Sequence, residues 1–148
     1  MTEADFEELE RDLVRPIPRR YRELMAAYPL DPGDANSRIA LDDDVRSVLA
    51  WNAELREGEW SAEWSADRFA IGCSPCGDTY FLDLAGSSPA VFVWDHETHR
   101  VTQEAADLDE FVAQQKRYEE EARASRASRP TARRRWWWPW GAQGPASS

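Results

Sequence analysis

One stretch of the sequence, residues 68–97, limits the fold of this chain more than any other. Three short runs within it, 69–71, 80–84 and 91–94, alternate in side-chain character, and this period of two is typical of half-buried β-strands. Gly, Pro, Ser and Asp residues fill the two intervals between the runs and favour reversal of the chain. Parallel pairing needs a crossover of about a dozen or more residues, so these short intervals predict an antiparallel meander. Residues 99–102 form a candidate fourth strand.

Helical periodicity precedes and follows the predicted sheet. Apolar residues recur at intervals of three and four within residues 6–13, 21–28, 45–55 and 108–118. Pro16 and Pro18 separate the first two of these stretches, and residues 29–40 are expected to be loop. The sequence therefore predicts an α+β domain over residues 1–118. In it, helices pack mainly on one face of an antiparallel meander of three to four strands.

The charge distribution divides the chain into two parts. All 28 acidic residues lie before Ala122 with 12 of the 18 basic residues, which gives that part a net charge of −16. The other six basic residues, all Arg, follow Ala122, where no acidic residue occurs, and give a net charge of +6. A strongly acidic domain repels nucleic acid and attracts basic partners. We therefore expect it to bind a protein, with no nucleic acid as its ligand.

Nothing in the sequence predicts membrane insertion of the domain. No run approaches the ~20 apolar residues of a spanning helix, and the charged N-terminal residues lack the apolar stretch of a signal peptide. With only two Cys residues in 148, we expect a cytoplasmic protein that folds without disulfides.

Two pairs of metal-binding residue types lie near the ends of predicted strands, Cys73 with Cys76 and His96 with His99. A meander would place the first turn and the corner after Trp94 at the same end of the sheet, where these four side chains could form a tetrahedral zinc site. The interpretation that we favour is a tight turn with inert thiols. We therefore expect no cofactor. With two His residues and no nucleophile set, glycine-rich phosphate loop or HExxH motif, we do not expect an enzyme.

Acidic residues and Trp residues provide candidate contacts for a partner. Each acidic group has a structural alternative as a helix cap or a solvated rim, and each Trp has an alternative as core. The functional interpretation is that the acids present negative potential to a basic partner and that the Trp side chains anchor the interface. The candidate residues are Asp42, Asp43, Asp44, Glu57, Glu59, Glu63, Asp95, Glu97, Trp60 and Trp64, and Trp94 shares the Trp interpretation.

Residues 119–148 form a basic, Trp-rich tail that we expect to be disordered. Its most distinctive part is a run of Arg followed by Trp, namely Arg133, Arg134, Arg135, Trp136, Trp137, Trp138 and Trp140. Trp partitions to the membrane interface and Arg is attracted to anionic lipid, so peripheral membrane attachment is one interpretation. Binding of single-stranded nucleic acid, folding of the tail onto the acidic domain, and a tail without a partner are the others.

The order of several short motifs resembles that of the SUKH superfamily over residues 6–115. These motifs are the helix 17–25, the Phe69-Ala70 strand, the Gly77-Asp78 turn, the strand 80–84, the Val91–Glu97 strand that ends in Trp-Asp-His-Glu, and the helix entry 108–111. The sequence departs from the pattern after Tyr28, in the Cys-Ser-Pro-Cys turn, and in its long tail.

The resemblance implies a binding protein, since that superfamily contains bacterial immunity proteins and fungal regulators of cell-wall assembly. Its first implication is a cytoplasmic immunity protein that neutralises a cognate toxin, of a basic nuclease type. The first alternative is a non-catalytic regulatory adaptor that the tail holds at the inner face of a membrane. The second alternative is a small zinc-stabilised module.

Overall fold

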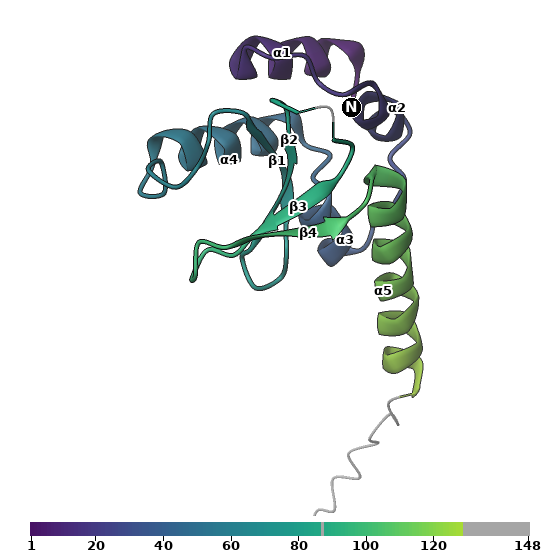
Figure 1. Ribbon diagram of the computed structural model, residues 1–148. Helices are drawn as coiled ribbons and strands as arrows, with labels where there is room; N and C mark the ends of the chain where they lie inside the picture. Colours follow the sequence, from purple (N-terminus) through teal and green to yellow (C-terminus); the bar gives the residue numbers. More distant parts are fainter. Residues whose placement is uncertain (87, 129–148) are drawn as a thin grey trace, which may run out of the picture.

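A four-stranded antiparallel sheet in the order β1-β2-β3-β4 lies at the centre of the computed structural model, which describes residues 1–86 and 88–128 (Figure 1). Each strand pairs with the next along the chain, as the short connections require. The elements in chain order are α1 (Glu3–Leu13), α2 (Arg19–Ala26), α3 (Ala35–Ala40), α4 (Val45–Glu57), β1 (Arg68–Cys73), β2 (Thr79–Asp83), β3 (Val91–Trp94), β4 (Val101–Ala105) and α5 (Leu108–Ser128). The predicted α+β meander is confirmed, with the candidate fourth strand as β4.

Side chains with oxygen acceptors cap the starts of α1, α3 and α4, whereas α2 begins after Pro18 without a side-chain cap. Thr2 and Asp5 form a reciprocal capping box at α1, and Asp44 accepts a hydrogen bond from the Arg46 N–H at α4. Asp34 accepts hydrogen bonds from two N–H groups of α3, those of Asn36 and Ser37. The prediction of loop throughout residues 29–40 was therefore wrong, because this cap starts a short helix at residue 35.

The two faces of the sheet bury different clusters. On one face, Phe69, Leu82 and Val91 pack against apolar side chains of α1, α2 and α5. On the other face, Ala70, Phe81 and Trp94 pack against Trp64, and α4 contributes Leu55 and the partly buried Trp51 to this cluster. The segment between α4 and β1 covers the rest. Because side chains alternate along each strand, the aliphatic ones lie mainly on the face covered by helices, and the aromatic ones lie mainly on the face covered by the segment between α4 and β1.

Strand β1 forms an edge of the sheet, and its outer edge is closed by polar groups of neighbouring segments. The buried Asn52 side chain accepts a hydrogen bond from the Ala70 N–H and donates one to the Ala70 carbonyl, both at 2.9 Å. The Asp42 N–H donates to the Ile71 carbonyl. The register then shifts between Ala70 and Gly72. A side chain at Gly72 would lie 2.2 Å from the Ala40 carbonyl oxygen, so only Gly permits this approach of β1 to α3.

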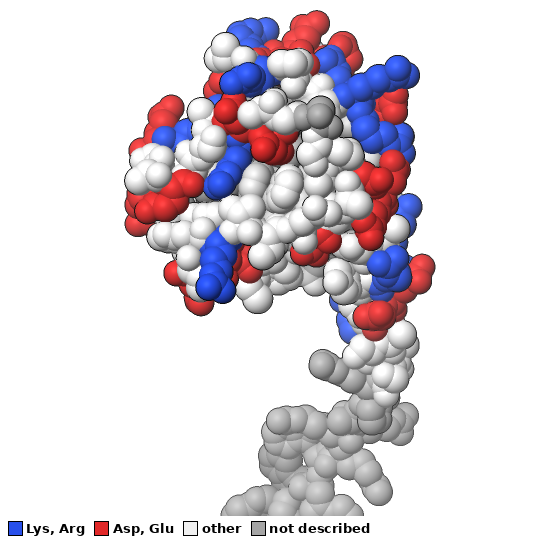
Figure 2. Space-filling model, in the orientation of Figure 1, with Lys and Arg blue, Asp and Glu red and all other residues white. Residues whose placement is uncertain are grey.

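Helix α5 continues past the boundary expected at 118 and reaches Ser128. It leaves the body of the molecule at its C-terminal end, as Figure 1 shows. None of the described helices is long and apolar enough to cross a membrane. Acidic and basic side chains surround an uncharged area in the view of Figure 2, which has the orientation of Figure 1.

Candidate functional site

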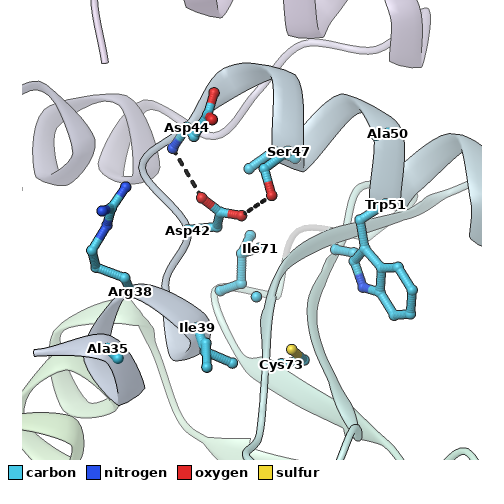
Figure 3. Close-up of a pocket in the computed structure, with 13 residues that line it drawn as sticks. Ala35, Arg38, Ile39, Asp42, Asp44, Ser47, Ala50, Trp51, Ile71 and Cys73 are labelled. Atoms are coloured by element: carbon cyan, nitrogen blue, oxygen red, sulfur yellow. Dashed lines mark hydrogen bonds between the residues drawn. The ribbon is translucent and has the colours of Figure 1, made fainter.

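An open groove of about 690 Å³ lies between α3, the first half of α4 and the exposed side of β1. We call it the α3–α4 groove. Arg38 and Ile39 of α3 lie on one side of it, and Ser47 and Trp51 of α4 lie on the other (Figure 3). Cys73 lies at the β1 side, where Figure 3 shows its sulfur between Ile39 and Trp51. Gly72, where β1 approaches α3 closely, is also a lining residue of the groove.

One end of the α3–α4 groove is acidic. Asp42 accepts hydrogen bonds from the Asp44 N–H at 2.9 Å and from the Ser47 hydroxyl, as the dashed lines in Figure 3 mark. Asp42 and Asp44 both line the groove, whereas Asp43 pairs with Arg38 at 3.3 Å. The predicted acidic run therefore both starts α4 and supplies two carboxylates to one hollow. Reversal of these charges would also remove the bonds that hold the start of α4.

The remainder of the α3–α4 groove is mainly apolar, apart from Arg38, which pairs with Asp43, and Ser47. Ile39 is 40% exposed, which is high for a large aliphatic side chain, and the buried Ile71 also lines the groove. Burial raises the pKa of the Cys73 thiol, and the nearby charge of Asp42 raises it further, so this thiol stays protonated. The indole N–H of Trp51 has no hydrogen-bond partner among the described residues. A hollow of this kind suits a side chain with an aliphatic stem and a positive end.

Trp51 connects the α3–α4 groove to the aromatic cluster on the same side of the sheet. Its ring lies edge-on to Trp60 at 6.2 Å, and Trp60 lies edge-on to Trp94 at 6.1 Å. Trp64 contacts both Trp94 and Phe81. Of the predicted interface Trp residues, Trp64 and Trp94 are buried and Trp60 is half-buried. Among the Trp residues that the structure describes, Trp51 and Trp60 are the two that are partly exposed and can contact a partner.

The second group of predicted acids lies at the far end of this cluster. His99 stacks on Trp94 at 5.7 Å and lies 3.8 Å from Glu63, so the corner after β3 and the segment after α4 are neighbours. Asp95 holds that corner by accepting hydrogen bonds from the N–H groups of Glu97 and Thr98, and the Thr98 bond is the main cause that lowers the pKa of Asp95. The exposed members of this group are Glu57, Glu59, Glu63 and Glu97.

The four candidate zinc ligands, which we did not expect to bind metal, have separate surroundings. His96 Nδ1 lies 3.0 Å from an Asp78 carboxylate oxygen, and His99 lies on Trp94. Cys73 faces the α3–α4 groove and Cys76 is exposed in the turn. Within residues 1–86 and 88–128, the cluster with metal-ligand spacing is Asp78, Asp95 and His96, which includes neither Cys. The turn and the corner do meet at one end of the sheet, as predicted, but through an Asp–His contact.

Sequence reasoning missed Trp51 and Ile39 as groove residues. Trp51 follows Val48 by three positions on α4, and this spacing could have identified it as a neighbour of the groove. Ile39 had no such signal, because the helix α3 was not predicted. The predicted tail contacts, Arg133, Arg134, Arg135, Trp136, Trp137, Trp138 and Trp140, lie outside the described residues.

Comparison with known protein families matches the chain to the model of the SMI1 / KNR4 family (SUKH-1) over residues 1–114. This range covers α1 to β4 and the first part of α5. No curated protein and no solved structure matches the chain.

Proposed function

The chain belongs to the SMI1 / KNR4 family (SUKH-1), and from this membership we propose that it is an immunity protein. It binds a cognate toxin with a basic surface, of the nuclease type, and neutralises it without catalysis. The interaction is stoichiometric, and the α3–α4 groove and the neighbouring Trp60 surface form the contact.

The observation that supports this site most is the composition of the α3–α4 groove. Two carboxylates, of Asp42 and Asp44, lie at one end of a hollow whose remainder is mainly apolar, and the lining cation Arg38 is paired with Asp43. An Arg or Lys side chain from a basic partner can place its aliphatic part against Ile39 and its charge beside these carboxylates. The surrounding domain has a net charge of −16 up to Ala122, which favours rapid association with a basic protein.

The arrangement also explains how binding would neutralise a nuclease. The substrate groove of such an enzyme presents basic residues to phosphate groups. Acidic side chains on the immunity protein compete for those residues, so that occupation of the groove excludes nucleic acid. Trp51 and Trp60 add aromatic contact area, which supplies the largest energies in protein interfaces.

Growth rescue tests this proposal in cells. The toxin probes are nuclease-type polypeptides, each expressed from an inducible promoter, beginning with any that is encoded beside the gene for this chain. Co-expression of the full chain should restore growth, and the Ile39→Arg variant should restore it poorly. The Val14→Arg variant is a matched control, since Val14 is 84% exposed at the end of α1 and does not line the groove. Failure of the full chain to rescue growth would refute the proposed function.

A further inference from the structure

A second groove, of about 370 Å³, lies on the opposite side of α3 from the first. We call it the α3–α5 groove. Its α5 wall is formed by Gln115, Tyr118, Glu119 and Ala122. The family match ends at residue 114, so this wall belongs to the part of α5 that follows the family-matched residues. The groove is therefore built jointly from the family domain and from the C-terminal extension of this chain.

The α3–α5 groove has three groups that a ligand could satisfy. Tyr118 is 56% exposed, and Tyr80 lies half-buried across the groove from it. Gln115 is 92% buried, and its amide nitrogen has no hydrogen-bond partner within the described part of the chain. Burial and the nearby charges of Glu104 and Tyr118 raise the pKa of Tyr80 to about 12, which is consistent with the negative character of this groove.

Two of the groove's three carboxylates already have partners. Glu119 accepts hydrogen bonds from the Ser37 hydroxyl and the Asp31 N–H, and Asp34 pairs with Arg126 at 3.4 Å. The third, that of Glu104, makes no ion pair with the described residues. The site thus offers one free carboxylate, one unpaired amide N–H and two Tyr rings. This set fits a segment that combines a cation, a backbone carbonyl and large aromatic side chains.

The chain contains such a segment shortly after Ser128, the last described residue. We propose that residues 133–140, Arg-Arg-Arg-Trp-Trp-Trp-Pro-Trp, bind the α3–α5 groove of the same molecule. The distance along α5 from Ser128 back to Tyr118 is roughly 15 Å at 1.5 Å per residue. Residues 129–135 can span up to about 23 Å, so the first Trp reaches the groove if the chain reverses after α5. Pro130 favours such a break in the helix.

The energetic reasoning favours an intramolecular contact over a free tail. Residues 129–148 carry four Arg and no acidic residue, next to a domain of strongly negative charge. A short tether gives an effective concentration in the millimolar range, so even weak stacking of Trp on Tyr118 is sufficient for occupancy. Covering the exposed Tyr118 ring also removes apolar surface from water. The segment therefore acts as an internal ligand that occupies the groove until a competitor displaces it.

The eight indole N–H groups of the full chain provide the test, since four belong to the tail and four to the domain. Cys76 is exposed next to Pro75, which lines the groove, so a nitroxide on Cys76 in a Cys73→Ser background reports on the groove. We expect the nitroxide to broaden the tail indole signals of the isotope-labelled full chain. The combined Arg133→Glu, Arg134→Glu and Arg135→Glu variant should recover them, and so should Tyr118→Ala with Glu104→Lys.

Each other outcome would overturn the proposal. Tail signals that are equally intense with and without the charge reversal would show that the segment does not bind the groove. Broadening in a mixture of isotope-labelled chain and separately nitroxide-labelled chain would assign the contact to a second copy. Tail signals that respond only to added anionic vesicles would assign the segment to a membrane surface. Toxin binding at the α3–α4 groove is measured separately, so its failure would leave this test unaffected.

Discussion

Replacement of Asn52 should lower the free energy of unfolding more than expected for a side chain of its size. Asn52 is 1% exposed and makes three hydrogen bonds at 2.9 Å, to the Val48 carbonyl and to both backbone groups of Ala70. The Asn52→Leu substitution keeps the volume similar but leaves the buried Ala70 N–H and carbonyl without partners. Each buried unpaired group costs about 1–3 kcal/mol, so we expect a loss of about 2–5 kcal/mol after the gain from apolar burial.

Guanidinium unfolding followed by circular dichroism measures this loss. An unchanged dependence of the unfolding free energy on denaturant concentration would show that the unfolded states of the two proteins are comparable. The control is Arg46→Leu, which makes the same polar-to-Leu change at an exposed position of the same helix. We expect its effect to stay within about 0.5 kcal/mol. A loss below about 1 kcal/mol for Asn52→Leu would refute the reasoning, because the edge of β1 would then be closed without this side chain.

Two further stability predictions follow from local geometry. Gly72→Ala should lower the unfolding free energy by about 1–3 kcal/mol or more, because the new Cβ meets the Ala40 backbone. Thermal unfolding measures the loss of stability. The control is Gly86→Ala, whose new Cβ would lie no closer than 3.7 Å to another atom and should leave the stability nearly unchanged. Equal losses for the two variants would contradict the account. Hydrogen bonds from the Ser37 and Asn36 N–H groups lower the pKa of Asp34 in the folded protein. Ionised Asp34 therefore adds to the free energy of unfolding in full above its ordinary pKa of 3.8, and this contribution is lost as the pH falls below that value. Asp34→Asn should flatten the acid side of the stability profile measured by urea unfolding, and an unaltered profile would exclude Asp34 as its cause.

The sheet could be predicted because its signals are local. The turn residues between the strands and the alternation of Tyr80, Phe81 and Leu82 define both the pairing and the two faces. Helix α3 could not be predicted, because its six residues have little apolar periodicity. Contacts distant in sequence support it, such as the hydrogen bond from Ser37 to Glu119 and those from the Tyr28 hydroxyl to the Ser37 and Leu41 carbonyls.

The candidate site was predictable only in part, because it too depends on contacts between residues that are distant in sequence. The run Asp42–Asp44 was identified from its charge, and the structure places two of its carboxylates in a groove. The groove itself combines α3, α4 and β1, and its shape depends on the close approach at Gly72. No single segment of sequence encodes such a hollow. The Trp residues could not be assigned either, since composition alone does not distinguish the buried Trp64 from the half-buried Trp60.

The proposal that a basic toxin binds the α3–α4 groove is tested most directly by calorimetric titration of the purified toxin domain into three forms of the full chain. Wild type and Val14→Arg should bind with equal affinity at one-to-one stoichiometry. Ile39→Arg should bind at least about tenfold more weakly, a loss of about 1.4 kcal/mol, because it fills the groove and repels the incoming cation. Equal affinity of all three forms would contradict the account and place the toxin elsewhere on the surface.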